Sequence, residues 1–384
     1  MRVYLDNAAT TPLNREVFLA IEPYLFEHFG NASSSHFHGR EARAAIEHSR
    51  GIIADLLNAN PRNIIFTSGG SEADNIAIRS GIRTNGIKLA ITTKLEHHAV
   101  LHTLQSLERN GEIRIIYLKN DEAGNISLQE LDTLLAANDR AFVSIMHGNN
   151  EIGNLNDIEA IASCCSRHHA VFHSDTVQSM GQYRYDTKQL AVDFLVGSAH
   201  KFHGPKGIGF LYRSDAQRVL PIIHGGAQES GQRAGTENVT AIVGLAKALE
   251  LACRDQAHHQ QHLKQLKERT ILKLINRIPG LTFNGAQVQP SLNSVLSISL
   301  PELASGISPL HYLDQHQICV SGGSACNSQA GGSHVLSALG YDFNKPTVRF
   351  SFSRYNTIEE IDYAVEKLAN LYVREQRSEL TAAC

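Results

Sequence analysis

The sequence lacks two features that would tie it to a membrane. No run reaches the roughly 18 apolar residues of a membrane-spanning helix. No apolar segment follows Met1, where a secretory signal would lie. The two absences argue against a membrane protein and predict a cytoplasmic location.

The chain also lacks an excess of charge of either sign. It has 35 Lys and Arg against 38 Asp and Glu, a net charge of -3. Recognition of nucleic acid or anionic lipid requires a clustered basic surface. We therefore expect a small-molecule substrate and neither a nucleic-acid nor a membrane partner.

Cysteine is scarce, and no CxxC pair occurs among Cys164, Cys165, Cys253, Cys319, Cys326 and Cys384. This spacing argues against a disulfide framework and a structural zinc site. Cys164 and Cys165, adjacent in a helical pattern, are predicted to be structural, and Cys319, on an apolar strand, to lie in the core. His258 and His262 have a spacing that suits zinc, but no third ligand is evident, so we predict no metal.

Between residues 60 and 213, short apolar runs alternate with segments of helical period. This alternation is typical of an α/β domain with a mostly parallel sheet. The seven predicted strands are residues 64–66, 89–92, 113–117, 141–146, 170–173, 194–197 and 208–212.

A chain of 384 residues favours two domains over one. After residue 250 a long helix is predicted over 255–276, followed by shorter strands and helices. Residues up to Asn14 have turn chemistry and are too short for the main sheet. We predict an N-terminal segment (1–14) that packs on the small domain, a large domain (15–250) and a smaller α+β domain (251–384).

Polar clusters that follow strands are the first candidates for a site, because ligands collect at the carboxyl ends of parallel strands. Residues 66–75 run from a strand through Gly69 and Gly70 into a helix start. Free N–H groups there, with the Ser71 hydroxyl, suit a phosphate. A simple helix cap explains this stretch equally well.

Two further clusters carry a carboxylate and an amine. Asp175, directly after a predicted strand, can pair with a protonated pyridine nitrogen or act as a helix N-cap. Lys201 lies between His200 and a glycine-rich turn, which suits an amine that forms a Schiff base beside a phosphate. The alternative is a solvated loop lysine. The nearby glycines do not have the GxGxxG spacing of a dinucleotide site.

Cys326 lies in a run of small and polar residues, 321–333, ahead of a helical segment at 335–339. A cysteine in such a loop is better explained by reactivity than by packing.

With these residues the chain resembles the cysteine desulfurases of the NifS/IscS type, in the class V aminotransferase branch of the fold-type I pyridoxal-phosphate (PLP) enzymes. The resemblance extends over nearly the whole chain. The matching stretches are residues 4–12, 30–34 with 39–40, 66–75, 96–100, 146–153, 175–178, 198–207, 233–237, 324–326 and 348–351.

The resemblance implies the fold-type I PLP fold, pyridoxal 5'-phosphate as cofactor, a homodimer, and roles for named residues. Lys201 would bind the cofactor covalently, Asp175 would pair with its ring nitrogen and His97 would stack on the ring. Gln178 and Asn150 would bond the side of the ring that carries the hydroxyl. Gly70, Ser71, Ser198 and His200 would surround the phosphate, joined by Thr236 of the other subunit. Arg349 would clamp the substrate carboxylate, with Arg354 a weaker candidate. Asn150 would also contact the substrate.

The implied reaction converts L-cysteine to L-alanine. Lys201 would remove the α-proton, and Cys326 would take the substrate sulfur as a persulfide for a sulfur-acceptor protein, such as an iron-sulfur scaffold. His97 would help to deprotonate Cys326. The sequence departs from relatives in its Asn-Ser-Gln-Ala-Gly-Gly loop and in its short C-terminal end, which puts docking to such a scaffold in doubt and leaves a dedicated role open.

The sequence leaves three alternatives to a cysteine desulfurase open. A selenocysteine lyase or an aminotransferase of the same fold would use Lys201, Asp175 and Arg349 equally, although an aminotransferase has no use for Cys326. A catalytically idle sulfur carrier or regulatory binding partner is disfavoured by the intact Lys201.

Overall fold

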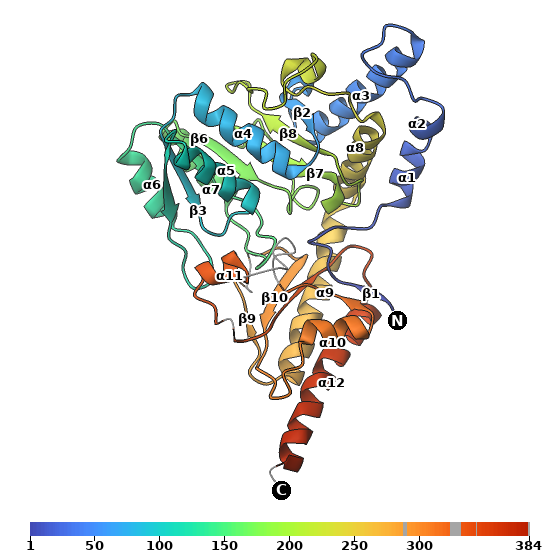
Figure 1. Ribbon diagram of the computed structural model, residues 1–384, viewed down its shortest axis with the longest axis vertical. Coiled ribbons are helices and arrows are strands. Elements are labelled where there is room, and N and C mark those ends of the chain that lie inside the picture. Colours follow the sequence, from blue (N-terminus) through green and yellow to red (C-terminus); the bar gives the residue numbers. More distant parts are fainter. Residues whose placement is uncertain (287–289, 323–331, 343, 383–384) are drawn as a thin grey trace.

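The computed structural model describes residues 1–286, 290–322, 332–342 and 344–382 (Figure 1). The helices are α1 (Arg15–Ile21), α2 (Pro23–Phe26), α3 (Phe37–Leu56), α4 (Gly70–Thr84), α5 (His98–Arg109), α6 (Leu128–Ala136), α7 (Ile158–Arg167), α8 (Val239–Arg254), α9 (Gln256–Arg277), α10 (Pro309–Gln315), α11 (His334–Ala338) and α12 (Ile358–Ala382). Short 3-10 turns are η1 (Pro61–Asn63), η2 (Ala199–Lys201) and η3 (Gln228–Gly231).

The main sheet contains seven strands in the order β2-β8-β7-β6-β5-β3-β4. They are β2 (Ile64–Thr67), β3 (Leu89–Thr93), β4 (Arg114–Leu118), β5 (Ala141–Ser144), β6 (Val171–Asp175), β7 (Phe194–Ser198) and β8 (Gly209–Arg213). Only β8 runs antiparallel to its neighbours. The prediction of one seven-stranded, mostly parallel sheet is confirmed, with strand ends within two residues of those expected.

Helices cover both faces of this sheet because successive strand side chains point to opposite faces. Ile64 and Phe66 of β2 pack in one apolar cluster with residues of α3, α7 and α8. Ile65, between them, packs in a second cluster with residues of α4 and α5. The strands are therefore apolar on both faces, which explains the near-continuous apolar runs in the sequence.

Two small sheets lie beyond the main sheet. The strands β9 (Thr282–Phe283), β10 (Val295–Ser299) and β12 (Thr347–Ser351) form an antiparallel sheet in the order β12-β10-β9. The N-terminal strand β1 (Val3–Tyr4) pairs in parallel with β11 (Ile318–Cys319). A separate apolar cluster joins residues of β1, β10 and β12 to α9, α10 and α12. The division at residues 14 and 250 stays a prediction, supported by the β1–β11 pairing and this separate cluster.

The cysteine predictions had mixed outcomes. Cys164 and Cys165 are buried, as expected for structural residues, but the prediction that Cys319 lies in the core is wrong, because its side chain is exposed. Strand β11 is only two residues long, so Ile318 takes the buried face and Cys319 the solvent face.

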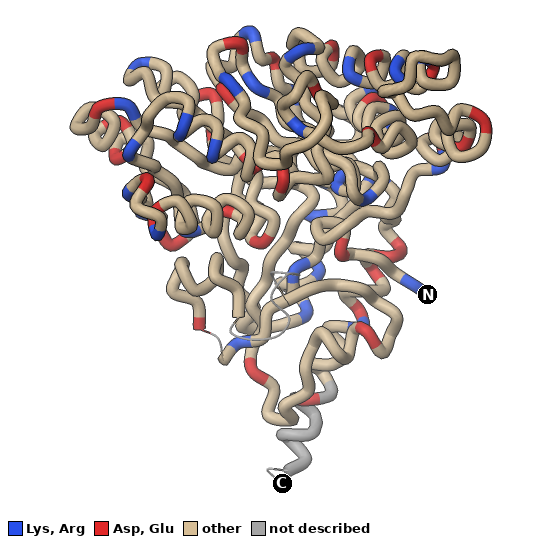
Figure 2. The backbone as a smooth tube through the Cα atoms, turned by 45° about the horizontal axis from the view of Figure 1, so that its top comes forward, with Lys and Arg blue, Asp and Glu red and all other residues tan. Residues whose placement is uncertain are grey.

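Charge is spread over the molecule. Figure 2 shows Lys and Arg interspersed with Asp and Glu along the chain, without one continuous basic face in this view. Among the described residues, no helix combines the length and apolarity that crossing a membrane requires.

Candidate active site

A cavity of about 250 Å³ lies at the carboxyl ends of β2, β5, β6 and β7. Ligands gather at this edge of a parallel sheet, because loops after neighbouring strands converge there. Ten residues that the sequence predicted for the site line the cavity: Gly70, Ser71, His97, Asn150, Asp175, Gln178, Ser198, His200, Lys201 and Arg349. The tertiary structure thus brings together side chains that are up to 279 positions apart in the sequence.

The start of α4 forms one end of the cavity. Its first residue is Gly70, and no side chain of the described residues caps the helix. A Cβ on Gly70 would lie 2.7 Å from Cγ2 of Val177, so the close approach requires glycine. Ser71, Ser198 and His200 also line an adjoining hollow of about 410 Å³. Uncapped N–H groups with hydroxyls around them suit an anion.

His200 is a neutral hydrogen-bond donor or acceptor beside the end of the cavity that the start of α4 forms. Burial, followed by the charges of Lys201 and Lys206, lowers the pKa of His200 to about 4. Its Nδ1 lies 3.2 Å from Oγ1 of Thr10. His200 therefore contributes hydrogen bonding rather than positive charge at neutral pH.

Two buried acids, Asp74 and Glu96, lie near Asp175, and Asp74 lines the cavity. Burial, followed by repulsion from Asp175 and Glu96, raises the pKa of Asp74 well above its usual range. Burial also raises the pKa of Glu96. Among the described residues, no Lys, Arg or His forms an ion pair with Asp175, whose Oδ1 accepts only the Val177 N–H at 2.9 Å. The raised pKa values of Asp74 and Glu96 favour their uncharged forms, which leaves Asp175 as the carboxylate that a cationic ligand atom would meet in the cavity.

His97 is the N-cap of α5, and its Nδ1 accepts the backbone N–H of Ala99 at 3.1 Å. Burial lowers its pKa, so the ring is neutral at pH 7. With Nδ1 engaged, the proton of a neutral ring lies on Nε2. His97 thus offers an aromatic face to the cavity. Deprotonation of Cys326 by His97 stays a prediction, and it would require the Ala99 hydrogen bond to break.

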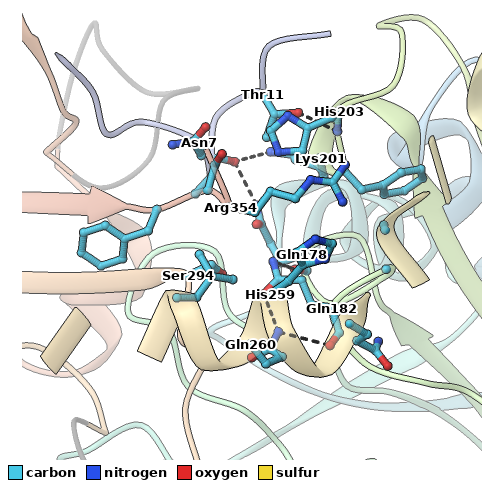
Figure 3. Close-up of a pocket in the computed structure, with 18 residues that line it drawn as sticks. Asn7, Thr11, Gln178, Gln182, Lys201, His203, His259, Gln260, Ser294 and Arg354 are labelled. Atoms are coloured by element: carbon cyan, nitrogen blue, oxygen red, sulfur yellow. Dashed lines mark hydrogen bonds between the residues drawn. The ribbon is translucent and has the colours of Figure 1, made fainter. Parts of the chain in front are cut away.

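Lys201 ends the η2 turn after β7, and its amine donates to the backbone carbonyls of Ala8 and Ala9. Gln178 Nε2 donates to the same Ala8 carbonyl at 2.9 Å. A second, smaller cavity of about 60 Å³ is lined by Lys201 together with Arg354, His259 and Ser294 (Figure 3). Lys201 therefore lies between two cavities, with Arg354 on the side away from Asp175.

Arg349 of β12 is almost fully buried, with 1% of its surface exposed. Its Nη2 lies 2.8 Å from Oδ1 of Asp6, and its Nη1 donates to the Asn150 carbonyl at 2.9 Å. Its Nε is buried and has no hydrogen-bond partner among the described residues. Asp6 and Asn150 thus hold the guanidinium at the cavity wall, where a carboxylate ligand can share it.

Among the described residues, Thr236 is the predicted site residue that does not line the cavity. Thr236 is exposed and lies on the loop before α8. Cys326 lies outside the described residues. Ser321 pairs with the cavity residue Arg349 through backbone hydrogen bonds. Nε2 of His334 bonds the carbonyl of Glu96, the residue before His97, at 2.9 Å.

Sequence reasoning missed the contributions of Asp6, Ala8, Asp74 and Glu96. Asp6 and Ala8 belong to the matched stretch 4–12, and Asp74 to the stretch 66–75, so their positions were noted without roles. The signal available in the sequence was an acid shortly after a predicted strand, as in Asp74 after 64–66 and Glu96 after 89–92. His258, considered as a zinc ligand, is exposed, and Nε2 of His262 bonds the Asn356 carbonyl at 2.9 Å.

A family model described as aminotransferase class-V matches residues 3–364. A protein named cysteine desulfurase IscS from Dictyoglomus turgidum is 41% identical over 376 residues, which are 96% of this chain and 94% of that protein. A solved structure titled NifS-like protein superposes with a TM-score of 0.89 at 34% identity, covering 97% of this chain and all of that one. Another, titled SspA in complex with cysteine, has a TM-score of 0.80 at 33% identity and covers 93% and 100% of the two chains.

Proposed function

Because this chain belongs to the aminotransferase class-V family, we propose that it is a cysteine desulfurase, which converts L-cysteine to L-alanine and takes the sulfur onto Cys326. The observation that carries the proposal is the convergence of Lys201, Asp175 and Arg349 on one cavity. An amine, a carboxylate and a guanidinium there suit a reaction at the α-carbon of an amino acid.

The cavity fits pyridoxal 5'-phosphate. The uncapped start of α4 suits its phosphate, the Asp175 carboxylate suits its protonated ring nitrogen, and the His97 ring suits its face. Lys201 would bind the cofactor covalently, while Asn150 and Gln178 would flank the ring hydroxyl. When bound, this cofactor withdraws electrons from the substrate α-carbon.

Three side chains of the protein then have distinct roles in the reaction. Arg349 orients the substrate by its carboxylate, since its planar fork matches two oxygens. The Lys201 amine removes the α-proton. The Cys326 thiolate bonds to the substrate sulfur as the carbon–sulfur bond breaks, so alanine leaves and Cys326 retains a persulfide.

A protein partner is part of the proposal, because a persulfide must be passed on for turnover. The acceptor would be a sulfur-carrying or iron-sulfur scaffold protein in the cytoplasm. One solved relative is titled as a complex with cysteine, which supports cysteine as the substrate here.

The proposal is tested by supplying the purified holoenzyme with L-cysteine and a thiol reductant. Alanine and sulfide should form in equal amounts. Arg349→Lys should raise KM for cysteine by about 10- to 100-fold, because the variant loses charged hydrogen bonds to the carboxylate. The steady-state rate of alanine formation measures both the turnover of the wild type and the KM of the variant.

Arg354→Lys is the matched control, since Arg354 lines the smaller cavity, and its KM should stay near the wild-type value. A larger KM increase in this variant than in Arg349→Lys would move the carboxylate clamp to Arg354. Formation of 3-mercaptopyruvate in place of alanine would instead assign the chain to the aminotransferases, and a strong preference for selenocysteine would assign it to the lyases. Absence of any turnover would favour an idle sulfur carrier.

We also propose a homodimer, in which Thr236 of each subunit reaches the other subunit's phosphate site. Exposed Thr236 and the exposed aromatic side chains of Phe26, Phe29 and Phe37 near α2 and α3 support it, since such apolar surface is typical of interfaces. Light scattering at micromolar concentration should give twice the 42.1 kDa chain mass. A stable, fully PLP-loaded monomer would contradict this assembly.

A further inference from the structure

Away from the cavity, Asp132 of α6 meets Cys164 and His168 at the end of α7. The two helices pack side by side (Figure 1). One ligand atom of each residue lies within 4.8 Å of the others. We propose that this Asp-Cys-His cluster is a zinc site that links α6 to α7.

The sequence places the donors by helical geometry. Cys164 and His168 are four positions apart, so both side chains project from one face of the α7 end toward α6. Sγ of Cys164 lies 3.5 Å from Oδ1 of Asp132, and Nε2 of His168 lies 3.0 Å from the same oxygen. Ligand pairs around tetrahedral zinc are separated by about 3.6 Å for sulfur–oxygen and about 3.4 Å for nitrogen–oxygen, given the usual bond lengths. The sulfur–oxygen and nitrogen–oxygen separations are therefore within a few tenths of an ångström of those around zinc, and the three ligand atoms all lie within 4.8 Å of one another.

The donor types also match zinc. Thiolate, imidazole and carboxylate together are ligands that zinc accepts, whereas magnesium and calcium prefer oxygen alone. Asp132 has 48% of its side chain exposed and His168 22%, so a water molecule can take the fourth position. Cys164 packs in the main apolar cluster, which holds its side chain in place.

Arg167 competes with a cation for this position, because its guanidinium lies 2.9 Å from Oδ1 of Asp132. Its side chain is 59% exposed and can turn to solvent. Zinc binding also releases the thiol proton of Cys164. Because Arg167 competes for Asp132, zinc binding should tighten when Arg167 is removed.

Among the described residues one other such group occurs, Asp74, His97 and Asp175, and it lies in the active-site cavity. A bound cofactor would occupy that cavity, so the test uses the PLP-loaded enzyme. The two sites are thereby kept apart, and failure of the zinc site would leave the proposed catalytic function untouched.

The experiment is a Co²⁺ titration of chelator-treated holoenzyme, with Co²⁺ as the spectroscopic substitute for zinc. Wild type should show a thiolate-to-cobalt charge-transfer band that saturates at one ion per chain and disappears when zinc is added. Cys164→Ser should lose the band, while the matched control Cys165→Ser, altered at the adjacent buried thiol, should retain it. Arg167→Ala should bind Co²⁺ at least several-fold more tightly.

Thermal stability gives a second measurement, which does not use the thiolate-to-cobalt absorption band. Zinc should raise the melting temperature of wild type, and His168→Gln should remove that increase while its metal-free melting temperature stays near that of wild type. His169→Gln is the neighbouring control. An unchanged cobalt band in Cys164→Ser, or an equal zinc-dependent increase in His168→Gln, would overturn the site.

Discussion

Lys201→Ala is expected to abolish alanine formation, with a loss of at least about 10²- to 10⁴-fold, the usual contribution of a positioned proton-transfer group. The variant loses both the covalent attachment of the cofactor and the amine that takes the α-proton. The Nζ of Lys201 lies at the cavity wall beside the Ala8 and Ala9 carbonyls. No other lysine in the described part of the chain lines the cavity. Alanine formation under saturating L-cysteine is the measurement.

A second readout locates the attachment directly. Borohydride reduction of the wild-type holoenzyme, followed by peptide mapping, should place the cofactor mass on the peptide that contains Lys201. Lys206→Ala is the matched control, since Lys206 lines the adjoining hollow rather than the cavity itself. Cofactor mass on Lys206, or wild-type turnover by Lys201→Ala, would refute the assignment.

Cys326→Ser is expected to release no sulfide although it still binds PLP and L-cysteine. Lys201, Asp175 and Arg349 carry the binding and the α-proton removal without the thiol. A serine hydroxyl is a far poorer nucleophile toward sulfur and cannot store a persulfide. Sulfide and alanine released by the purified variant are measured under the conditions used for wild type.

Cys319→Ser is the control, because Cys319 is an exposed thiol on strand β11, seven positions before Cys326 in the sequence. It should turn over L-cysteine as wild type does. If Cys326 only packed in its loop, Cys326→Ser would produce alanine at a near-normal rate with a small loss of stability. Substantial cysteine turnover by that variant would remove Cys326 from the mechanism and favour the aminotransferase alternative.

Local pattern was sufficient to predict the main sheet. Each strand is a short apolar run between turn residues. Buried parallel strands have such runs because helices cover both faces of the sheet. The strand ends also located the candidate residues, since Asp175 and Ser198 are the last residues of β6 and β7 and Lys201 follows at once. Because parallel strands share one carboxyl edge, the sequence alone predicted that these residues converge.

Only the tertiary structure decided which distant groups meet there. Nothing near Arg349 in the sequence identifies Asp6, 343 positions away, as its ion-pair partner. The raised pKa of Asp74 depends on burial and on Asp175 and Glu96, which come from different strand ends. The meeting of Asp132 with Cys164 depends on how α6 packs against α7. Sequence periodicity determines which face a residue takes within its own element, whereas contacts between elements depend on how those faces pack together.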